Sequence, residues 1–593
     1  MAKDYIALPP AGKFLFYTIL VGIIAGFGAV VFYFLCCQVG THYFLDFIVG
    51  YKPPHSGGEP ALFSETATPF RRWLLFIIPA IGGLLSGLLV YTFAPEAEGH
   101  GTDGAIEAYH YKQGNIRARV PIIKTIASFF TLGTGGSGGR EGPIAQIGAG
   151  FGSFLANKLR LSVQERRWLM AAGMGAGVGS IFKAPLAGAL FAAEVMYRTS
   201  ALEPEVLIPA AIASVVGYCI FCLFFGWKPI FNAKELYFQD PLQLFPYAIC
   251  SIILAGGAIL YIKSFYGVHG FFKKLNIPNH IKPAIGGLLT GIIGYFLPQT
   301  LAFGYGYVQQ ALDGKLTATL LLAIAFGKIL TTSFSIGSGG SAGVFGPSIV
   351  IGATLGGAIG QVLHHLMPNL VTQPESFVII GMAGFFAAAS NTPVSTIIFV
   401  AEMTGSYHLL IPSLLVSTLS FLISRDFTIY CKQVPTRLDS PAHKGDFIVD
   451  ILEKVYVRDL LPRLRKVEVI PETMKFKDFI KFFSYTQQHY FPVVDEQGRF
   501  TGIFSINDIR QYLFDPSRVD ALVIKDIAQR EIIYTVPSEN LDDVLIKFTI
   551  KNLNEIPVVD EKDHTKLLGM LTRREVISLY NRRLHQMKSG EAV

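Results

Sequence analysis

A glutamate interrupts an otherwise apolar, glycine-rich segment, GTGGSGGREGP at 133–143. An ionisable residue in such a segment is costly and by default functional. A helix that starts here would direct its free N–H groups and the positive end of its dipole at an anion. The carboxylate of Glu141 would compete with that anion, and protonation would release it, which describes a gate. The alternative is that Glu141 pairs with Arg140 as an internal brace.

The same kind of segment occurs again further along the chain. GSGGSAGVFGP sets Pro347 against Pro143 with an offset of 204 residues, and Phe345 then stands in the place of Glu141. A second pair of apolar segments sets Glu402 against Glu194 with an offset of 208. Two corresponding halves with broken helices are typical of transport proteins whose ion site lies at the repeat interface.

The elements that position these motifs follow from composition. The chain has 593 residues, of which 51% are hydrophobic and 16% are charged, with 60 glycines and a net charge of +7. Charged residues make up about 10% of residues 1–433 and 30% of residues 434–593. Several uncharged stretches in the first part exceed the roughly 20 residues that cross a bilayer. This pattern excludes a soluble enzyme and a nucleic-acid binder, and it predicts an all-α polytopic membrane domain followed by a globular α/β domain.

We expect the membrane domain to span 1–433, with repeat halves at roughly 73–227 and 283–424. The soluble part, 434–593, also repeats, because HYFPVVDEQGRFTGIFSINDIRQYL resembles NEIPVVDEKDHTKLLGMLTRREVISLY. Each copy predicts a strand, a turn, a strand and then a helix capped by Ser505 or Thr572, with Asp508 or Glu575 three residues on. Paired units of this form resemble CBS domains, at about 450–515 and 520–585.

The motifs GSGGREGP and GVFGP, the AlaGluVal segment and the CBS pair occur in an order that resembles the CLC family of chloride channels and chloride/proton antiporters. The resemblance implies a homodimer with one anion pathway per subunit, built from broken helices in two inverted repeats. It implies that Glu141 is the gating glutamate, that Val344 and Phe345 donate backbone N–H groups, and that Tyr430 donates a hydroxyl. Taken alone, Tyr430 reads as an interfacial anchor.

Two departures from the family pattern bear on function. Where the family has GlySerGlyIlePro, this chain has Gly99-His100-Gly101-Thr102-Asp103, so a histidine ring N–H or a shifted threonine hydroxyl would serve the anion, and the preferred anion stays open. The full set of expected anion-binding residues is His100, Gly101, Thr102, Arg140, Gly142, Val344, Phe345 and Tyr430.

The second departure is Val195, which follows Glu194 where proton-coupled members carry a relay glutamate. Valine cannot carry a proton, so the sequence favours a passive chloride channel gated by Glu141. The alternative is a chloride/proton antiporter with an unusual proton route. A fluoride exporter and a CBS-containing cation transporter are weaker alternatives.

The CBS resemblance implies an adenine nucleotide (ATP, ADP or AMP), with Asp508 and Glu575 at the ribose and Ser505 and Thr572 near the phosphates. The alternative is that these four residues are simple helix caps. We expect no required cofactor, no metal site and no enzymatic activity, because the sequence has no phosphate-binding loop and no nucleophile with a base. The expected location is the plasma (inner) membrane, within a lipid bilayer, with the CBS pair in the cytoplasm and chloride as the permeant ion.

Overall fold

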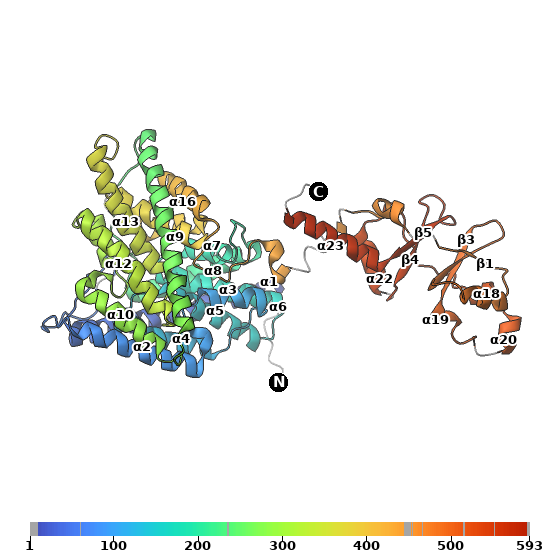
Figure 1. Ribbon diagram of the computed structural model, residues 1–593, viewed down its shortest axis with the longest axis horizontal. Helices are drawn as coiled ribbons and strands as arrows, with labels where there is room; N and C mark the ends of the chain where they lie inside the picture. The colour runs from blue at the N-terminus through green and yellow to red at the C-terminus, as the bar shows by residue number, and fades with distance from the viewer. Residues whose placement is uncertain are drawn as a thin grey trace. The chain divides into compact units, whose positions relative to one another are not determined.

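A computed structural model describes residues 10–59, 61–233, 236–443, 452–453, 455–464, 467–513, 516–550 and 552–589. The chain divides into two compact units, Met1–Ala442 and His443–Val593 (Figure 1). The segment after residue 433 still packs on the first unit, since the Arg198 N–H donates to the Val434 carbonyl at 3.0 Å and Ser440 Oγ lies 2.8 Å from His110 Nδ1.

The first unit consists of helices, coloured blue to orange in Figure 1. Among its described residues, six helices are long and apolar enough to cross a membrane. This confirms the predicted all-α membrane body. The helices are α1 (Pro10–Tyr33), its π-helical continuation η1 (Phe34–Val49), α2 (Leu74–Phe93), α3 (Thr102–Tyr111), α4 (Arg119–Gly133), α5 (Glu141–Lys158), α6 (Val163–Ile181), α7 (Pro185–Glu194), α8 (Pro204–Phe225), α9 (Leu244–Lys274), α10 (Lys282–Phe296), α11 (Tyr305–Leu312), α12 (Ala318–Gly337), α13 (Phe345–Leu366), α14 (Ser376–Ser390), α15 (Pro393–Thr404) and α16 (Leu410–Ser424), with short 3-10 turns η2 (Pro95–Ala97), η3 (Pro241–Gln243), η4 (Pro298–Thr300), η5 (Arg437–Asp439) and η6 (Pro441–His443).

Helices break where the sequence requires it. Pro185 and Pro393 open α7 and α15, since proline lacks the N–H that a first helical turn leaves unpaired. The loops before α5 and α13 pair with each other: the Gly139 N–H donates to the Gly343 carbonyl at 2.6 Å, and the Gly343 N–H donates back to Gly139 at 2.7 Å. A Cβ on Gly139 would lie 2.7 Å from the Gly346 nitrogen, so this approach requires glycine. The two repeated motifs therefore meet at the starts of α5 and α13.

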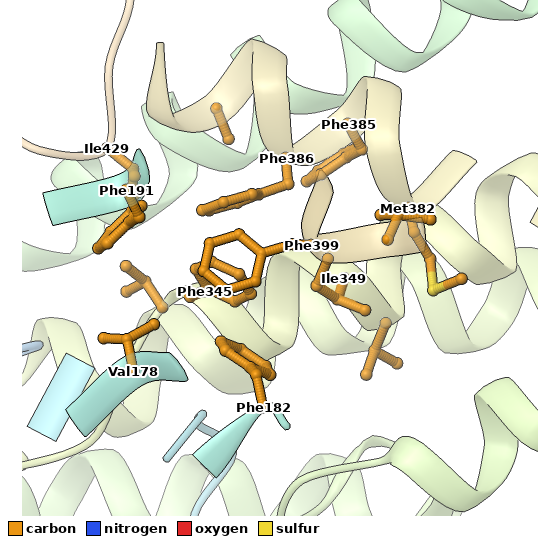
Figure 2. Packing of buried hydrophobic residues seen from close by; sticks show 14 of the residues in the cluster. Val178, Phe182, Phe191, Phe345, Ile349, Met382, Phe385, Phe386, Phe399 and Ile429 are labelled. Atoms are coloured by element: carbon orange, nitrogen blue, oxygen red, sulfur yellow. The ribbon is translucent and has the colours of Figure 1, made fainter. Parts of the chain in front are cut away.

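Aromatic rings fill the core beside this meeting point, as Figure 2 shows. The ring of Phe345 lies 3.9 Å from that of Phe386, 4.4 Å from that of Phe182 and 5.1 Å from that of Phe399, centroid to centroid. All four side chains are buried. The start of α13 is thus bordered on one side by packed, apolar rings.

The second unit confirms the predicted α/β repeat. In the first copy β1, β2 and β3 form a sheet in that order, with β1 parallel and β3 antiparallel to β2; in the second copy β4 pairs antiparallel with β5. A helix precedes each hairpin and another follows it. The elements are η7 (Val457–Arg463), β1 (Ile470–Pro471), α18 (Phe476–Phe483), β2 (Tyr490–Val494), β3 (Phe500–Ser505), α19 (Ile506–Ile509), α20 (Pro516–Ala521), α21 (Ile524–Ile527), α22 (Leu541–Ile550), β4 (Glu555–Val559), β5 (Leu567–Thr572) and α23 (Arg573–Ser589).

Candidate anion pathway

The side chain of Glu141 turns from the start of α5 to the start of α13. Its Oε2 accepts a hydrogen bond from the Gly346 N–H at 3.0 Å, and its Oε1 accepts one from the hydroxyl of Tyr305. Only 1% of the residue is exposed. The Gly346 N–H belongs to the first turn of α13, whose donors have no acceptor within the helix. A carboxylate therefore occupies a position suited to a bound anion.

We expected Arg140 to bind the anion or to pair with Glu141, but its hydrogen-bond partner is another carboxylate. Its Nη2 donates to Glu59 Oε1 at 2.7 Å, and its guanidinium carbon lies 5.2 and 5.0 Å from the ring centroids of Tyr33 and Tyr305. Its Nε is 3.9 Å from Glu141 Oε1. The guanidinium thus forms a buried ion pair with Glu59 and lies beside Glu141.

His100, in the segment before α3, lies next to Tyr430, with ring centroids 5.5 Å apart. His100 Nε2 is 3.2 Å from Asp103 Oδ2. Two buried polar atoms, His100 Nδ1 and the Tyr430 hydroxyl, have no hydrogen-bond partner among the described residues. Buried polar groups are usually satisfied, so this pair fits a site that receives a polar ligand. Thr102 is also buried, at the first position of α3.

The two glycines expected at the anion site, Gly101 and Gly142, allow the backbone segments around it to lie close together. Gly101 precedes α3 with a φ of +85°, and a Cβ there would lie 2.8 Å from the Gly142 carbonyl oxygen. A Cβ on Gly142 would lie 2.1 Å from the His100 carbonyl oxygen. Both positions therefore exclude side chains and hold the starts of α3 and α5 in contact.

Val344 and Phe345 lie at the start of α13, as the resemblance implies. The Val344 carbonyl accepts hydrogen bonds from the Ser348 N–H at 3.2 Å and the Ser348 hydroxyl at 2.8 Å. The donor that reaches the carboxylate is Gly346, one residue beyond the two that we expected. A glycine inside a glycine-rich motif carries no signal that distinguishes it, so the sequence could not single it out.

Glu194 and Glu402 form a reciprocal pair of helix caps. The Glu194 carboxylate accepts the N–H groups of Val394 at 3.0 Å and Ser395 at 2.7 Å, at the start of α15. The Glu402 carboxylate accepts those of Leu186 at 3.3 Å and Ala187 at 2.9 Å, at the start of α7. Each carboxylate satisfies two otherwise unpaired donors of the partner helix.

Val195 caps the end of α7 and is fully buried. The carboxylate of its neighbour Glu194 caps the start of α15. A different buried carboxylate lies nearby. The Glu203 N–H donates to the Ala193 carbonyl at 3.0 Å, and the Tyr197 hydroxyl donates to Glu203 Oε1. Glu203 is 0% exposed. From the sequence it reads as an ordinary residue of a polar loop.

The sequence analysis did not identify two buried lysines, Lys124 and Lys328. Lys124 donates to the carbonyls of Ala97 at 3.0 Å and Gly99 at 2.7 Å, before α3. Lys328 donates to those of Thr300 at 3.2 Å and Ala302 at 2.6 Å, before α11. The two lysines are 204 residues apart, the offset of the glycine motifs, and that spacing was the signal that could have found them.

In the second unit, the four residues expected at a nucleotide act as helix caps. Asp508 Oδ2 accepts the N–H and the hydroxyl of Ser505, both at 2.7 Å, and Glu575 Oε2 accepts those of Thr572 at 2.8 and 2.7 Å. Ser505 and Asp508 also line a cavity of about 680 Å³ between the two copies, whereas Glu575 lines a separate one of about 100 Å³. The structure thus brings one of the two predicted pairs to a cavity large enough for a nucleotide.

Comparison with known proteins decides the family. The family model described as voltage gated chloride channel matches residues 82–425, and the CBS domain model matches 457–515 and 524–582. The chain belongs to the CLC family of voltage gated chloride channels. It is an integral membrane protein with two CBS domains.

Similar CLC proteins carry two kinds of name. The "Putative chloride channel protein ClcB-like" of Ralstonia nicotianae is 29% identical over 61% of this chain and 84% of its own length. The "H(+)/Cl(-) exchange transporter ClcA" of Salmonella agona is 32% identical over 60% of this chain and 76% of its own length.

Solved structures confirm the CLC fold. A slow cyanobacterial Cl−/H+ antiporter superposes with a TM-score of 0.63 at 24% identity, over 71% of this chain and 95% of its own. A eukaryotic CLC transporter superposes with a TM-score of 0.57 at 18% identity, over 95% of this chain and 98% of its own. The second match extends over the CBS part as well.

Proposed function

We propose that this CLC protein exchanges chloride for protons and that Glu141 is the group that alternates between binding a proton and occupying the anion site. The observation that carries the proposal is the hydrogen bond from the Gly346 N–H to the Glu141 carboxylate at 3.0 Å. A chloride ion and this carboxylate need the same donor, so each must displace the other. Protonation removes the charge with which the carboxylate competes.

Exchange replaces the passive channel that Val195 favoured. Two arguments support this choice. Relatives at 31% and 32% identity carry the name H(+)/Cl(−) exchange transporter. In addition, the missing relay at Val195 matters only if no other carboxylate can serve, and Glu203 is available close to that position.

We propose Glu203 as the inner proton acceptor. Its backbone bond to Ala193 holds it against the last turn of α7, where Val195 ends the helix. The hydroxyl of Tyr197 steadies its carboxylate, and the ring of His110 lies 5.5 Å from that of Tyr197. A buried carboxylate bound by a hydroxyl can take up and release a proton without a large movement.

The anion would bind between the Glu141 carboxylate with its donors and the pair formed by His100 and Tyr430. Hydrogen-bond donors without full positive charge suit a site that must both select and release an anion. Lys124 and Lys328 hold the loops before α3 and α11 through hydrogen bonds to backbone carbonyls.

Proton transport coupled to chloride is the direct test. Proteoliposomes loaded with chloride and diluted into a chloride-free buffer should take up protons against a proton gradient as chloride leaves. The ratio of the two fluxes should stay fixed when the chloride gradient is varied. Chloride efflux without any proton uptake would instead establish the channel and reject exchange.

The proposal includes a homodimer in the plasma membrane with the CBS pair on the cytoplasmic side, as the family resemblance implies.

It also includes adenine nucleotide binding at the cavity lined by Ser505 and Asp508. Asp508 Oδ1 accepts a hydrogen bond from Gln529 Nε2 at 2.7 Å, so the carboxylate is held at the cavity edge.

We expect ATP or AMP to raise the thermal unfolding temperature of the purified full-length protein. The substitution Asp508→Ala should abolish that shift, because it removes the acid at the large cavity. Glu575→Ala removes the corresponding cap at the small cavity and should leave the shift in place. An unchanged shift in Asp508→Ala would place the nucleotide elsewhere.

A further inference from the structure

We infer that Tyr305 is a latch that holds the Glu141 carboxylate at the start of α13 and thereby sets how readily an anion enters. This inference rests on the proposed function of Glu141 as the gate. Tyr305 is a positioning residue: it contacts the gate and not the transported ion.

The latch completes the binding of the carboxylate. One oxygen of Glu141 accepts the Gly346 N–H and the other accepts the Tyr305 hydroxyl, so both oxygens have a donor. A hydrogen bond to an ionised acceptor is stronger than one between neutral groups. Since both donors favour the ionised carboxylate, the hydroxyl stabilises the occupied site against an incoming anion.

Tyr305 is itself held from several sides. Its ring lies 5.0 Å from the guanidinium carbon of Arg140 and 5.7 Å from the ring of Phe231. Arg140 is fixed in turn by Glu59, whose Oε2 accepts the Ser56 hydroxyl at 3.0 Å. The ion pair of Arg140 with Glu59 and its cation–π contact with Tyr305 therefore orient the tyrosine ring.

The backbone also fixes the latch. Tyr305 is the first residue of α11, and Gly304 before it has a φ of +82°. Lys328 holds the preceding loop through the carbonyls of Thr300 and Ala302. The hydroxyl therefore has little freedom to follow the carboxylate when it leaves. When the Glu141 carboxylate leaves, its hydrogen bond from the Tyr305 hydroxyl must therefore break, because the hydroxyl cannot move with the carboxylate.

A small cavity of about 60 Å³ reaches this arrangement, lined in part by Glu59, Arg140 and Tyr305. Tyr305 therefore lies at the wall of this cavity, together with the ion pair of Arg140 and Glu59.

The test is Tyr305→Phe, which removes only the hydroxyl. Chloride binding, measured by isothermal titration calorimetry on the purified protein, should become roughly tenfold tighter, because one charge-assisted hydrogen bond no longer opposes the anion. Chloride efflux from proteoliposomes should rise, with more chloride ions moved per proton. The matched control is Tyr307→Phe on the same helix, whose hydroxyl lies 2.9 Å from that of Tyr51 and should be without effect on either quantity.

The double variant Tyr305→Phe/Glu141→Gln separates a latch from a structural role. The hydroxyl acts through the carboxylate, so adding Tyr305→Phe to Glu141→Gln should change nothing further. An equal effect in both backgrounds, an equal effect of Tyr307→Phe, or unchanged chloride affinity in Tyr305→Phe would each overturn the latch. If Glu141→Gln by itself alters neither flux nor affinity, the gate assignment fails first, which is a distinguishable result.

Discussion

Glu141→Gln is expected to abolish proton transport while chloride flux continues and loses its dependence on pH. Glutamine has the size of glutamate but cannot bind or release a proton. Its amide is neutral, so the charge-assisted hydrogen bonds that the Gly346 N–H and the Tyr305 hydroxyl donate to the wild-type carboxylate are lost. The side chain should therefore leave the start of α13 and resemble the protonated state.

The measurement is chloride and proton flux in proteoliposomes between pH 4.5 and 7.5, in steps of about one pH unit, with proton flux expected to fall about 100-fold or more. Glu402→Gln serves as the matched control, because it neutralises another carboxylate that binds backbone N–H groups, at α7. That variant should lose thermal stability and keep the pH dependence. A Glu141→Gln protein whose chloride flux still follows pH would show that the gate is another group.

Glu203→Gln is expected to uncouple the fluxes: chloride still moves, whereas proton uptake falls about 100-fold. The amide oxygen still accepts the Tyr197 hydroxyl, so the local structure should persist. What is lost is only the ability to carry a proton at a buried position beside the end of α7.

The control lies two residues on. Glu205 pairs with Arg437 at 2.6 Å and is partly exposed, so Glu205→Gln makes the same chemical change at the same helix without removing a buried proton acceptor. Coupling should be intact in that variant. If Glu203→Gln exchanges protons at the rate of the wild type, the inner acceptor is a different residue. The proposal of exchange itself is then still tested by the wild-type measurement.

The sequence predicted those parts of the pathway that depend on local chemistry. Clusters of glycine and proline interrupt the apolar segments around Glu141 and Phe345, so the helix breaks there could be located, and a carboxylate among apolar residues made Glu141 the candidate gate. The strand and helix order of the CBS pair followed from hydrophobic alternation and caps.

The partners of Glu141 could not be predicted in this way. Tyr305 lies 164 residues from Glu141, and a tyrosine in an apolar chain reads as an interfacial anchor. Arg140 stands next to Glu141 in sequence, which suggested a shared anion site, whereas burial pairs it with distant Glu59. The cap formed by Glu194 could not be predicted either, because the helix that it caps belongs to the other repeat.

That exchange of caps has a consequence for how the chain is made. The donors that Glu194 needs, at Val394 and Ser395, lie about 200 residues further along. At 5–20 residues per second, a ribosome takes about 10–40 s to reach them. Throughout that interval the start of α7 and the carboxylate of Glu194 both lack their native partners. The first repeat therefore gains these caps only after the second repeat has been made, so the ends of α7 and α15 are completed late in synthesis.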